Sequence, residues 1–406
     1  MKINFLYDFF SAQPYGNVLY HGGGAYGVAV AKILLKRKNL YTKVKYFFAV
    51  NKRYIISDNE LLELFKDANV EIIPILDQKE IVNIIIEKQI DIFFSPVPYY
   101  LADIITDANV LSSVKIKGTL HGLRNLEIYR DSKEIYYRKG LINQAKAVYK
   151  YVNPKKVINR ERKKIEKLLR ILDYSFLTQT VHTKYSVISH FPYIDRNRIF
   201  VDTVFPDYLF RDYSINIEAS YYNEFPSLKR NRYFLLVGGG RREKNLVRAC
   251  EAMTTADYIL PDDVSLVATG VPDYLKNRLL RNKSVQKRCF LLGYVDSNSL
   301  DELYKNCYAL LYPSLSEGLG YPPLEAFKYK KPVLASAVTA IPVFYGESVI
   351  YFNPYDIYEM ANRLCYIMDK KDYNEYSRRG YVFYNKILKY VEHHNYDDLF
   401  KYLELS

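Results

Sequence analysis

Residues 308–336 read YALLYPSLSEGLGYPPLEAFKYKKPVLAS, and they indicate the fold class more clearly than any other part of the chain. Its two ends, YALLY and PVLAS, are short and almost wholly apolar, as strands that are buried on both faces are. Between them, a loop with two glycines leads into a segment that begins with two prolines, which suit the first turn of a helix. A strand, a helix and a second strand in this order form a βαβ unit, so the stretch predicts parallel strands.

The same alternation runs through most of the chain. Apolar runs such as INFLY (3–7) and VKYFFAV (44–50) alternate with amphipathic segments such as EIVNIIIEK (80–88), and the pattern starts again at RYFLLVG (232–238). We therefore expect an α/β fold in which two Rossmann-like, doubly wound parallel-sheet domains face a central cleft.

The domain boundaries follow from where this rhythm stops. We place an N-terminal, acceptor-side domain at residues 1–210, with a basic helical insertion at about 125–172. The C-terminal, ligand-binding domain covers residues 211–385. Residues 386–406 are amphipathic, and we expect them to form a final helix that crosses back to the N-terminal domain.

Composition limits the class of protein. The 406 residues carry a formal net charge of +13, which favours an anionic partner: a nucleic acid, an acidic membrane surface or a phosphorylated small molecule. No window of about twenty uncharged apolar residues occurs, so we expect a cytoplasmic protein. The four cysteines form no C-x-x-C pair, which favours buried thiols over structural zinc.

The excess positive charge lies mainly in residues 130–170. It has two readings: a solvated helical face, or a docking surface for anionic lipid or a polyanionic acceptor. The second reading would place the protein at the inner face of a membrane as a peripheral protein.

Ligands of parallel α/β sheets bind beyond the carboxyl ends of the strands. The N-terminal domain has two candidate loops, one rich in glycine and one that contains a histidine. HGGGAYG (21–27) matches G-x-G-x-x-G, but it starts far from the strand that ends near Asp8, and Asn51 stands where a dinucleotide site needs an acid. We expect the backbone of Gly22, Gly23 and Gly24 to approach a phosphate or a sugar. His121 directly follows an apolar strand, and we expect it to hydrogen-bond to substrate.

A third loop, VGGGRREKN (237–245), places Arg241, Arg242 and Lys244 at the start of a helix. Cations there oppose the helix dipole, so three of them favour a bound anion such as phosphate. The P-loop spacing is absent, which argues against ATP hydrolysis.

The fourth loop contains Glu317 and Glu325 around Gly318 and Gly320. Carboxylates repel a diphosphate, so we expect both acids to accept hydrogen bonds from hydroxyl groups, while the free amides between them suit an anion. Cations for a diphosphate beside acids that recognise hydroxyl groups describe a site for a nucleotide sugar.

Residues from about 232 to 355 resemble the retaining glycosyltransferases of family 4, which have the GT-B architecture of two Rossmann-like domains. The resemblance rests on VGGGRREKN and on GYVDSNSLDELYKNCYALLYPSLSEGLGYPPLEAFKYKKPVLASAVTAIPVFYGESVIYFNP (293–354), which contains two glutamates separated by seven residues. Val343 departs from the pattern, because many members have an acid there, and the 125–172 insertion has no counterpart that can be placed.

The resemblance implies a role for each matched residue. Glu325 would hold the ribose hydroxyls and Glu317 the donor sugar, with His121 near the transferred sugar. Lys244 and either Arg241 or Arg242 would grip the diphosphate. The other donor-binding residues that it implies are Gly22, Gly23, Gly24, Gly239, Gly240, Tyr294, Val295, Gly318, Leu319, Gly320 and Tyr321.

The sequence therefore predicts a retaining glycosyltransferase that moves a hexosyl group to a saccharide or a lipid-linked acceptor, in cell-surface polysaccharide or glycoconjugate synthesis. No D-x-D triplet occurs, so we expect no metal, and Arg242 and Lys244 would stabilise the leaving diphosphate. A sugar-nucleotide epimerase on the same fold is the alternative. A nucleic-acid-binding protein is less favoured, because the 42 tyrosines are spread along the entire chain and do not interleave with the basic run.

Overall fold

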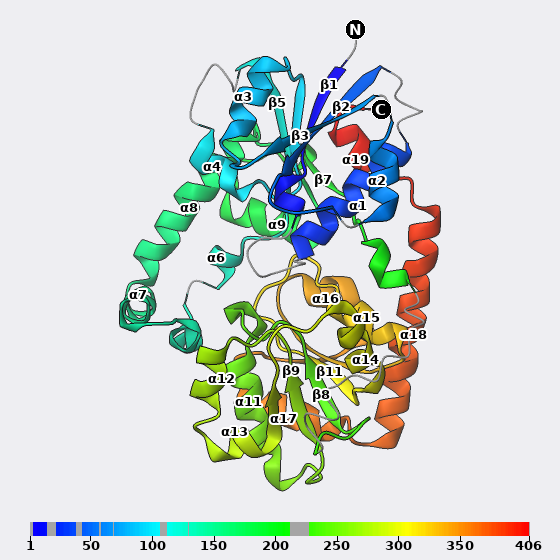
Figure 1. The fold of residues 1–406 in the computed structure, drawn as a ribbon. Helices are drawn as coiled ribbons and strands as arrows, with labels where there is room; N and C mark the ends of the chain where they lie inside the picture. The colour runs from blue at the N-terminus through cyan, green and yellow to red at the C-terminus, as the bar shows by residue number, and fades with distance from the viewer. Residues whose placement is uncertain are drawn as a thin grey trace. The chain divides into compact units, whose positions relative to one another are not determined.

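The computed structural model describes residues 3–13, 22–37, 43–56, 58–67, 69–105, 112–128, 130–211 and 227–405. The chain forms two compact units. Unit 1 comprises Met1–Leu123, Asn159–Asp207 and Asn395–Ser406, and unit 2 comprises Arg124–Ile158 and Tyr208–His394. Each unit is built on one parallel sheet with helices packed against it (Figure 1).

Unit 1 contains a seven-stranded sheet in the order β3-β2-β1-β4-β5-β6-β7. Its centre is apolar and aromatic: Tyr7 pairs with Phe48 on one side and Phe94 on the other, with ring centroids 5.1 and 5.5 Å apart. The strands are β1 (Ile3–Asp8), β2 (Val44–Asn51), β3 (Val70–Ile75), β4 (Ile92–Ser95), β5 (Lys115–Leu120), β6 (Phe176–Thr178) and β7 (Ile199–Val201). The helices are α1 (Gly22–Lys36), α2 (Asn59–Phe65), α3 (Glu80–Glu87), α4 (Leu101–Ile104), α9 (Val181–His190) and α19 (Asp397–Tyr402).

Unit 2 contains a six-stranded sheet in the order β10-β9-β8-β11-β12-β13, which repeats the order of the first six strands of unit 1. The strands are β8 (Tyr233–Leu236), β9 (Ser265–Ala268), β10 (Cys289–Leu291), β11 (Ala309–Tyr312), β12 (Val333–Ser336) and β13 (Ile350–Phe352). The helices after β8 are α11 (Leu246–Thr255), α12 (Asp273–Leu279), α13 (Lys283–Arg288), α14 (Ser297–Asn306), α15 (Pro322–Lys328), α16 (Ala340–Tyr345), α17 (Ile357–Tyr366) and α18 (Lys370–His393).

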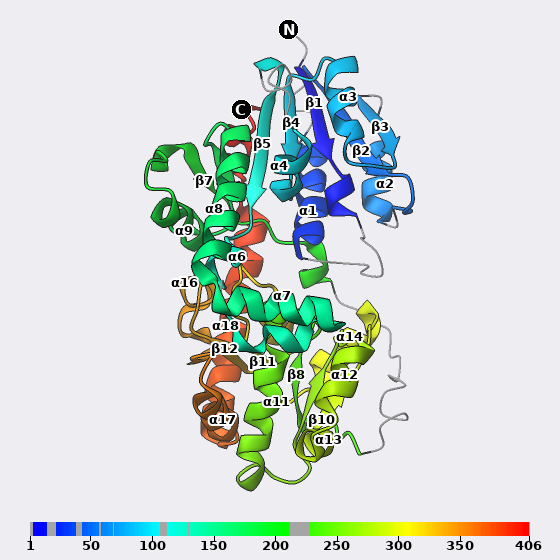
Figure 2. The same cartoon turned by 90° about the vertical axis from the view of Figure 1, so that its left-hand side faces the viewer.

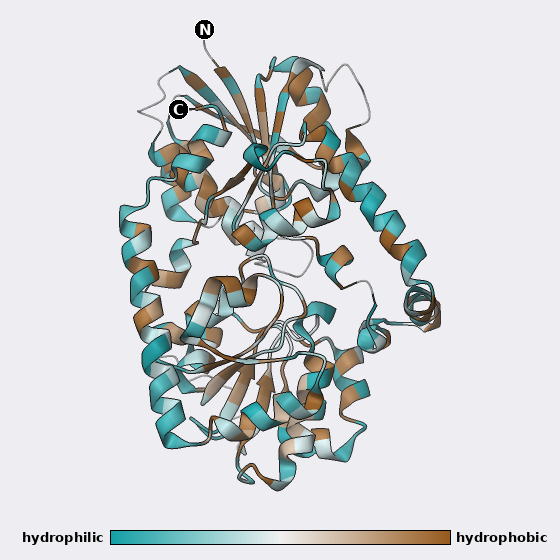
Figure 3. Ribbon diagram, turned by 180° about the vertical axis from the view of Figure 1, so that it is seen from behind, coloured by the Kyte–Doolittle hydropathy of each residue, from teal (hydrophilic) through white to brown (hydrophobic). Residues whose placement is uncertain are grey.

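Both sheets are apolar because helices cover them. The strands are brown in the hydropathy view, whereas the outer helix α18 is largely teal (Figure 3). In unit 2, α18 packs on α15 at a helical glycine: a Cβ on Gly380 would stand only 2.2 Å from the ring of Phe327. Cys250, Cys289 and Cys307 are buried free thiols, as the sequence predicted, whereas Cys365 is a free thiol that is only partly buried. None of the described helices combines the length and the apolar character that crossing a bilayer requires.

The insertion differs from the prediction in its location. The sequence assigned residues 125–172 to the N-terminal domain, but Arg124–Ile158 pack with unit 2. This segment comprises α6 (Arg124–Glu127), the 3-10 helix η4 (Ser132–Tyr137), α7 (Leu141–Val152) and the start of α8 (Pro154–Ile171) (Figure 2). Two kinds of contact join it to unit 2: the buried side chain of Asp131 forms an ion pair of 2.7 Å with Arg248 of α11, and Tyr137 belongs to the hydrophobic core of that unit.

The end of the chain differs as well. The prediction of one final helix over 386–406 was wrong, because α18 ends at His393 and α19 starts at Asp397. Tyr396 lies between them with φ of 55°, a left-handed conformation that ends a helix. Residues 395–406 belong to unit 1, where the Tyr402 hydroxyl accepts a hydrogen bond of 2.7 Å from the amide of Gly118.

Candidate functional site

The topology of unit 2 places two loops together. The strand order changes direction between β8 and β11, and the loops that follow such strands at their carboxyl ends form the usual ligand site of open α/β sheets. The first loop runs from Val237 into the 3-10 helix η7 (Arg242–Lys244), and the second contains Glu317. These are the third and fourth loops that the sequence singled out.

A buried ion pair joins the two loops. Lys244 Nζ lies 2.5 Å from Glu317 Oε1 and 4.8 Å from the centre of the Tyr312 ring. The side chains of Lys244 and Glu317 are only 6% and 14% exposed. Burial by itself would raise the pKa of Glu317, but the attraction of Lys244, to which Arg241 adds, lowers it to about 2. Glu317 is therefore a carboxylate, and Lys244 is its counterion.

The pKa of Lys244 is lowered, because its burial outweighs the attraction of Glu317. A cation that is taken out of water in this way gains from any further negative charge that reaches it. An anion that reached the pair would therefore stabilise the charged form of Lys244.

The two arginines of the first loop have different environments. Arg242 donates to the carbonyl of Ile128 at 3.1 Å and forms an ion pair with Glu134, whose side chain is 3% exposed. Glu134 lies in η4, so the insertion holds Arg242. The role of Arg242 at the diphosphate, as the sequence predicted it, would therefore require this buried ion pair to break.

Arg241 is placed differently. Its side chain is half exposed, and its guanidinium lies over Gly238, 3.5 Å from the point where a Cβ of that glycine would stand. Lys244 Cγ is 3.8 Å from the same point, so the Arg241 guanidinium and the Lys244 side chain lie on the same side of the glycine turn. Gly238 has φ of 75° and Gly240 has no room for a Cβ beside the carbonyl of Gly270, so this turn requires glycine.

The Glu317 loop is fixed by contacts on both sides. The Glu317 amide donates to Thr339 Oγ1 at 3.0 Å, and Ser316 Oγ donates to Glu127 Oε2 at 2.5 Å. Gly320 has φ of 84°, and a Cβ there would collide with the Tyr312 hydroxyl. Thr339 has φ of 52°, which a β-branched residue rarely adopts and which stores about 1–3 kcal/mol of strain. The contacts around Glu317 therefore hold a strained backbone in place.

Glu325 lies on α15 in a different environment from Glu317. Its Oε2 accepts a hydrogen bond of 2.6 Å from the Tyr304 hydroxyl of α14. Burial raises the pKa of Glu325 to about 7, although the Tyr304 hydrogen bond acts in the opposite direction. Glu317 is thus ionised near neutral pH, whereas Glu325 titrates there.

The two loops lie in the part of the chain that matches a known protein family. Residues 222–382 match the family model of the glycosyl transferases group 1. This match confirms the predicted resemblance at the level of group 1, over that range; membership of family 4 stays a prediction.

Curated relatives of this group 1 region match over short stretches. The chain is 32% identical over 130 residues to the O-antigen chain mannosyltransferase RfbU of Salmonella typhimurium, which covers 30% of this chain and 35% of that protein. It is 37% identical over 68 residues to the serotype-specific mannosyltransferase WbdA of Escherichia coli, or 17% of this chain and 8% of that protein. The chain thus spans about a third or less of the length of these relatives.

Solved structures match over nearly the full length. Anabaena Alr3699/HepE in complex with UDP-glucose has a TM-score of 0.63 at 12% identity, covering 99% of this chain and 98% of that one. Sucrose-phosphate synthase from Thermosynechococcus elongatus has a TM-score of 0.64 at 14% identity, covering 97% and 96%. Identities this low show the fold alone, and they confirm two Rossmann-like domains of the GT-B class.

Outside the two loops of the group 1 region, Tyr294 and Val295 follow β10. Tyr294 is exposed and Val295 is buried. The carbonyl of Gly293 accepts a hydrogen bond of 2.7 Å from the amide of Gly270, which ties this segment to the loop after β9. Their place near a base stays a prediction.

His121 follows β5 in unit 1, as predicted. Its Nε2 lies 2.7 Å from the carbonyl of Pro96, so this nitrogen carries the proton and donates. Its Nδ1 then accepts from the side-chain amide of Gln179 at 3.0 Å. Both ring nitrogens are thus bonded within the protein, and a hydrogen bond to substrate would have to replace one of these bonds.

The glycine loop of unit 1 differs from the prediction. Gly22, Gly23 and Gly24 form the first turn of α1, whereas the sequence placed them in a loop before the helix. Residues 14–21 lie outside the described residues. Gly27 has a packing role, because a Cβ there would stand 2.6 Å from Ala12 Cβ.

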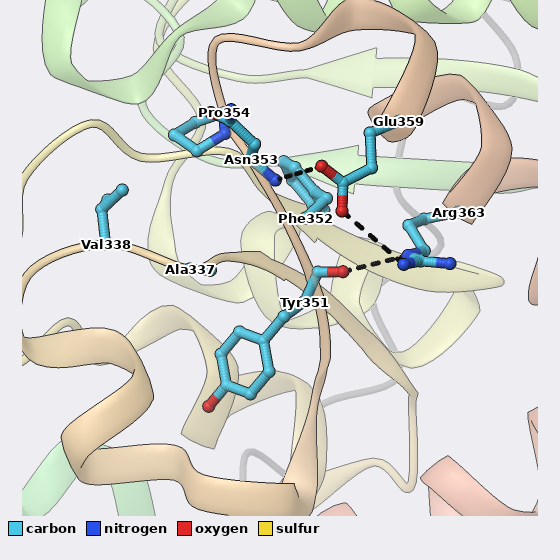
Figure 4. A pocket seen from close by; sticks show the side chains of 8 residues that line it. All are labelled: Ala337, Val338, Tyr351, Phe352, Asn353, Pro354, Glu359 and Arg363. Atoms are coloured by element: carbon cyan, nitrogen blue, oxygen red, sulfur yellow. Dashed lines mark hydrogen bonds and ion pairs between the residues drawn. The ribbon is translucent and has the colours of Figure 1, made fainter.

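A separate pocket of about 380 Å³ opens at the carboxyl ends of β12 and β13 (Figure 4). Its charged groups satisfy one another: Glu359 accepts from the amide of Asn353 at 3.0 Å and lies 3.6 Å from Arg363. Arg363 also donates to the carbonyl of Tyr351 at 3.0 Å. The pocket contains none of the residues that the sequence singled out, and we assign it no ligand.

Proposed function

We propose that the protein is a retaining glycosyltransferase that moves a hexosyl group from a nucleotide-diphosphate sugar to a saccharide or a lipid-linked acceptor. The observation that carries the proposal is the buried Lys244–Glu317 pair at the point where the strand order of unit 2 changes direction. The match to group 1 and the names of the curated relatives support a role in the synthesis of a cell-surface polysaccharide.

The diphosphate is the part of the donor that these loops suit best. Lys244 and Arg241 would neutralise its negative charge, and we assign this role to Arg241 because Glu134 already holds Arg242. Charge stabilisation aimed at the leaving group lowers the barrier when it is in place before the bond breaks. On this proposal, protein cations do the work that a divalent metal does in other transferases.

The two glutamates would read hydroxyl groups. Glu317 accepts hydrogen bonds as a carboxylate at neutral pH, because its pKa is about 2. Glu325 would receive the ribose hydroxyls. Neither acid is needed as a nucleophile in this scheme. The bond between the anomeric carbon and the diphosphate oxygen breaks, its electron pair leaves with the diphosphate, and the acceptor oxygen bonds to the same face of the sugar. The acceptor proton passes to the departing phosphate oxygen.

The test has two stages. Thermal shifts with UDP, GDP, ADP and dTDP sugars identify the donor, since a ligand at 100 times its Kd stabilises by about 2.7 kcal/mol. Release of the nucleoside diphosphate is then measured with and without candidate acceptors, starting with mannosyl donors because the relatives are mannosyltransferases.

We expect release that depends on acceptor and is unchanged by EDTA. Lys244→Ala should lower it by about 100-fold or more, whereas the exposed Lys283→Ala should leave it unchanged. Conversion of the donor sugar without any acceptor would show that the protein is an epimerase and would refute transfer.

A further inference from the structure

Helix α7 (Leu141–Val152) presents its apolar face to solvent. At 100° for each residue, Leu141, Ile142, Ala145, Val148, Tyr149 and Val152 fall within an arc of about 120°. All six residues are exposed, and Leu141, Ile142 and Val152 have exposed fractions of 84%, 75% and 67%. A helix on the surface of a globular protein normally buries this face.

The polar side of α7 attaches it to unit 2. Lys150 Nζ lies 3.1 Å from Glu134 of η4, and the Tyr151 ring lies 4.6 Å below the guanidinium of Arg130. Ala147 is the buried residue of the helix. Because the helix is held through its polar side, its apolar stripe is left to meet something outside unit 2.

The surroundings of this stripe are basic. Lys139, Lys146, Lys155 and Lys156 are exposed just before, within and just after α7.

We propose that α7 docks on an anionic lipid bilayer, lying in the plane of the interface. The apolar stripe would enter the boundary between headgroups and acyl chains, and the flanking lysines would contact lipid phosphates. A second copy of the chain is a poorer occupant, because it would bring the same positive charges to the same place. The proposal concerns where the protein works and does not depend on the function proposed above.

Vesicle flotation tests this proposal with the full chain. We expect binding to phosphatidylcholine vesicles that contain phosphatidylglycerol, weaker binding in high salt, and little binding to pure phosphatidylcholine. The double variant Leu141→Glu/Val152→Glu should lower the ratio of bound to unbound protein at least tenfold.

The matched control is Tyr258→Glu/Ile259→Glu, which replaces two exposed apolar residues elsewhere in unit 2 and changes the net charge equally. We expect it to bind vesicles within about twofold of wild type, because two added negative charges away from α7 should account for only a small part of the loss. Donor turnover in solution should be unchanged in both variants, which separates this proposal from the proposed function.

Three results would overturn the proposal: no flotation with anionic vesicles, equal flotation with neutral vesicles, or equal loss in the two double variants. Self-association that Leu141→Glu/Val152→Glu abolishes, without vesicle binding, would also overturn it and would assign the stripe to a second copy.

Discussion

Replacing Glu317 by glutamine should destabilise the protein more than replacing the whole Lys244–Glu317 pair. Glu317→Gln keeps the shape of the side chain but leaves a buried lysine without its counterion, a change that costs about 3–5 kcal/mol in comparable pairs. The pKa gives a similar value: a fall from 4.5 to about 2 corresponds to about 3 kcal/mol at 1.36 kcal/mol for each pKa unit.

When both residues of the pair are replaced, as in Lys244→Met/Glu317→Gln, the loss of the buried lysine determines the stability. Burial lowers the pKa of Lys244 despite its partner, so the charged lysine costs stability in the folded state. Replacing it by methionine removes that cost, and Lys244→Met/Glu317→Gln should therefore lose about 1 kcal/mol or less. Both variants should lose transfer, since the site is damaged in each.

Urea unfolding followed by far-ultraviolet circular dichroism measures these free energies. The contribution of Glu317 comes from a lowered pKa, so it should be present above pH 4.5 and disappear as the pH falls toward 2. If the double variant is as unstable as Glu317→Gln alone, the uncompensated lysine is not the cause and the reasoning fails.

Three further predictions concern neighbouring residues. The pKa of Glu325 is raised, so its contribution to stability is fully present below pH 4.5 and is lost as the pH rises through 7. The free energy of unfolding of wild type should therefore fall by up to about 3 kcal/mol relative to that of Glu325→Gln between pH 5 and 8. Parallel plots of this free energy against pH for the two proteins would contradict the prediction. Arg241→Ala should lower kcat/KM about 100-fold at unchanged stability, whereas Arg242→Ala should lower the free energy of unfolding by about 1–3 kcal/mol; the reverse result in a kinetic and unfolding comparison would restore Arg242 as the phosphate ligand. Gly380→Ala should destabilise by about 1–3 kcal/mol because its Cβ overlaps Phe327, and an unchanged thermal midpoint would show that the helices separate freely.

The sequence predicted the sheets well because parallel strands are short, apolar and regularly spaced. It also selected the loops of Lys244 and Glu317, because each contains glycine and follows such a strand, and the structure brings these two side chains together; their role stays a prediction. The sequence did not predict β6, β7 or β13, each of which has only three residues.

The sequence could not predict contacts between residues that lie far apart in the chain. The choice between Arg241 and Arg242 depends on Glu134, which lies 108 positions earlier in the chain. The hydrogen bond from Tyr304 to Glu325 could be found only in the structure. The same holds for the positive φ of Thr339, because a β-branched residue in a loop leaves no signal of this strain in a single sequence. The first turn of α1 was missed because three glycines favour a loop.

The path of the backbone has a consequence for synthesis on the ribosome. Residues 124–158 of unit 2 emerge early, but the rest of that unit, residues 208–394, emerges late. Unit 1 begins with the first strand and is completed only by residues 395–406. A nascent chain therefore contains Asp131 long before Arg248, its buried ion-pair partner, has been made. Domains usually fold in order as they are made, but here neither half can finish before most of the other has been translated.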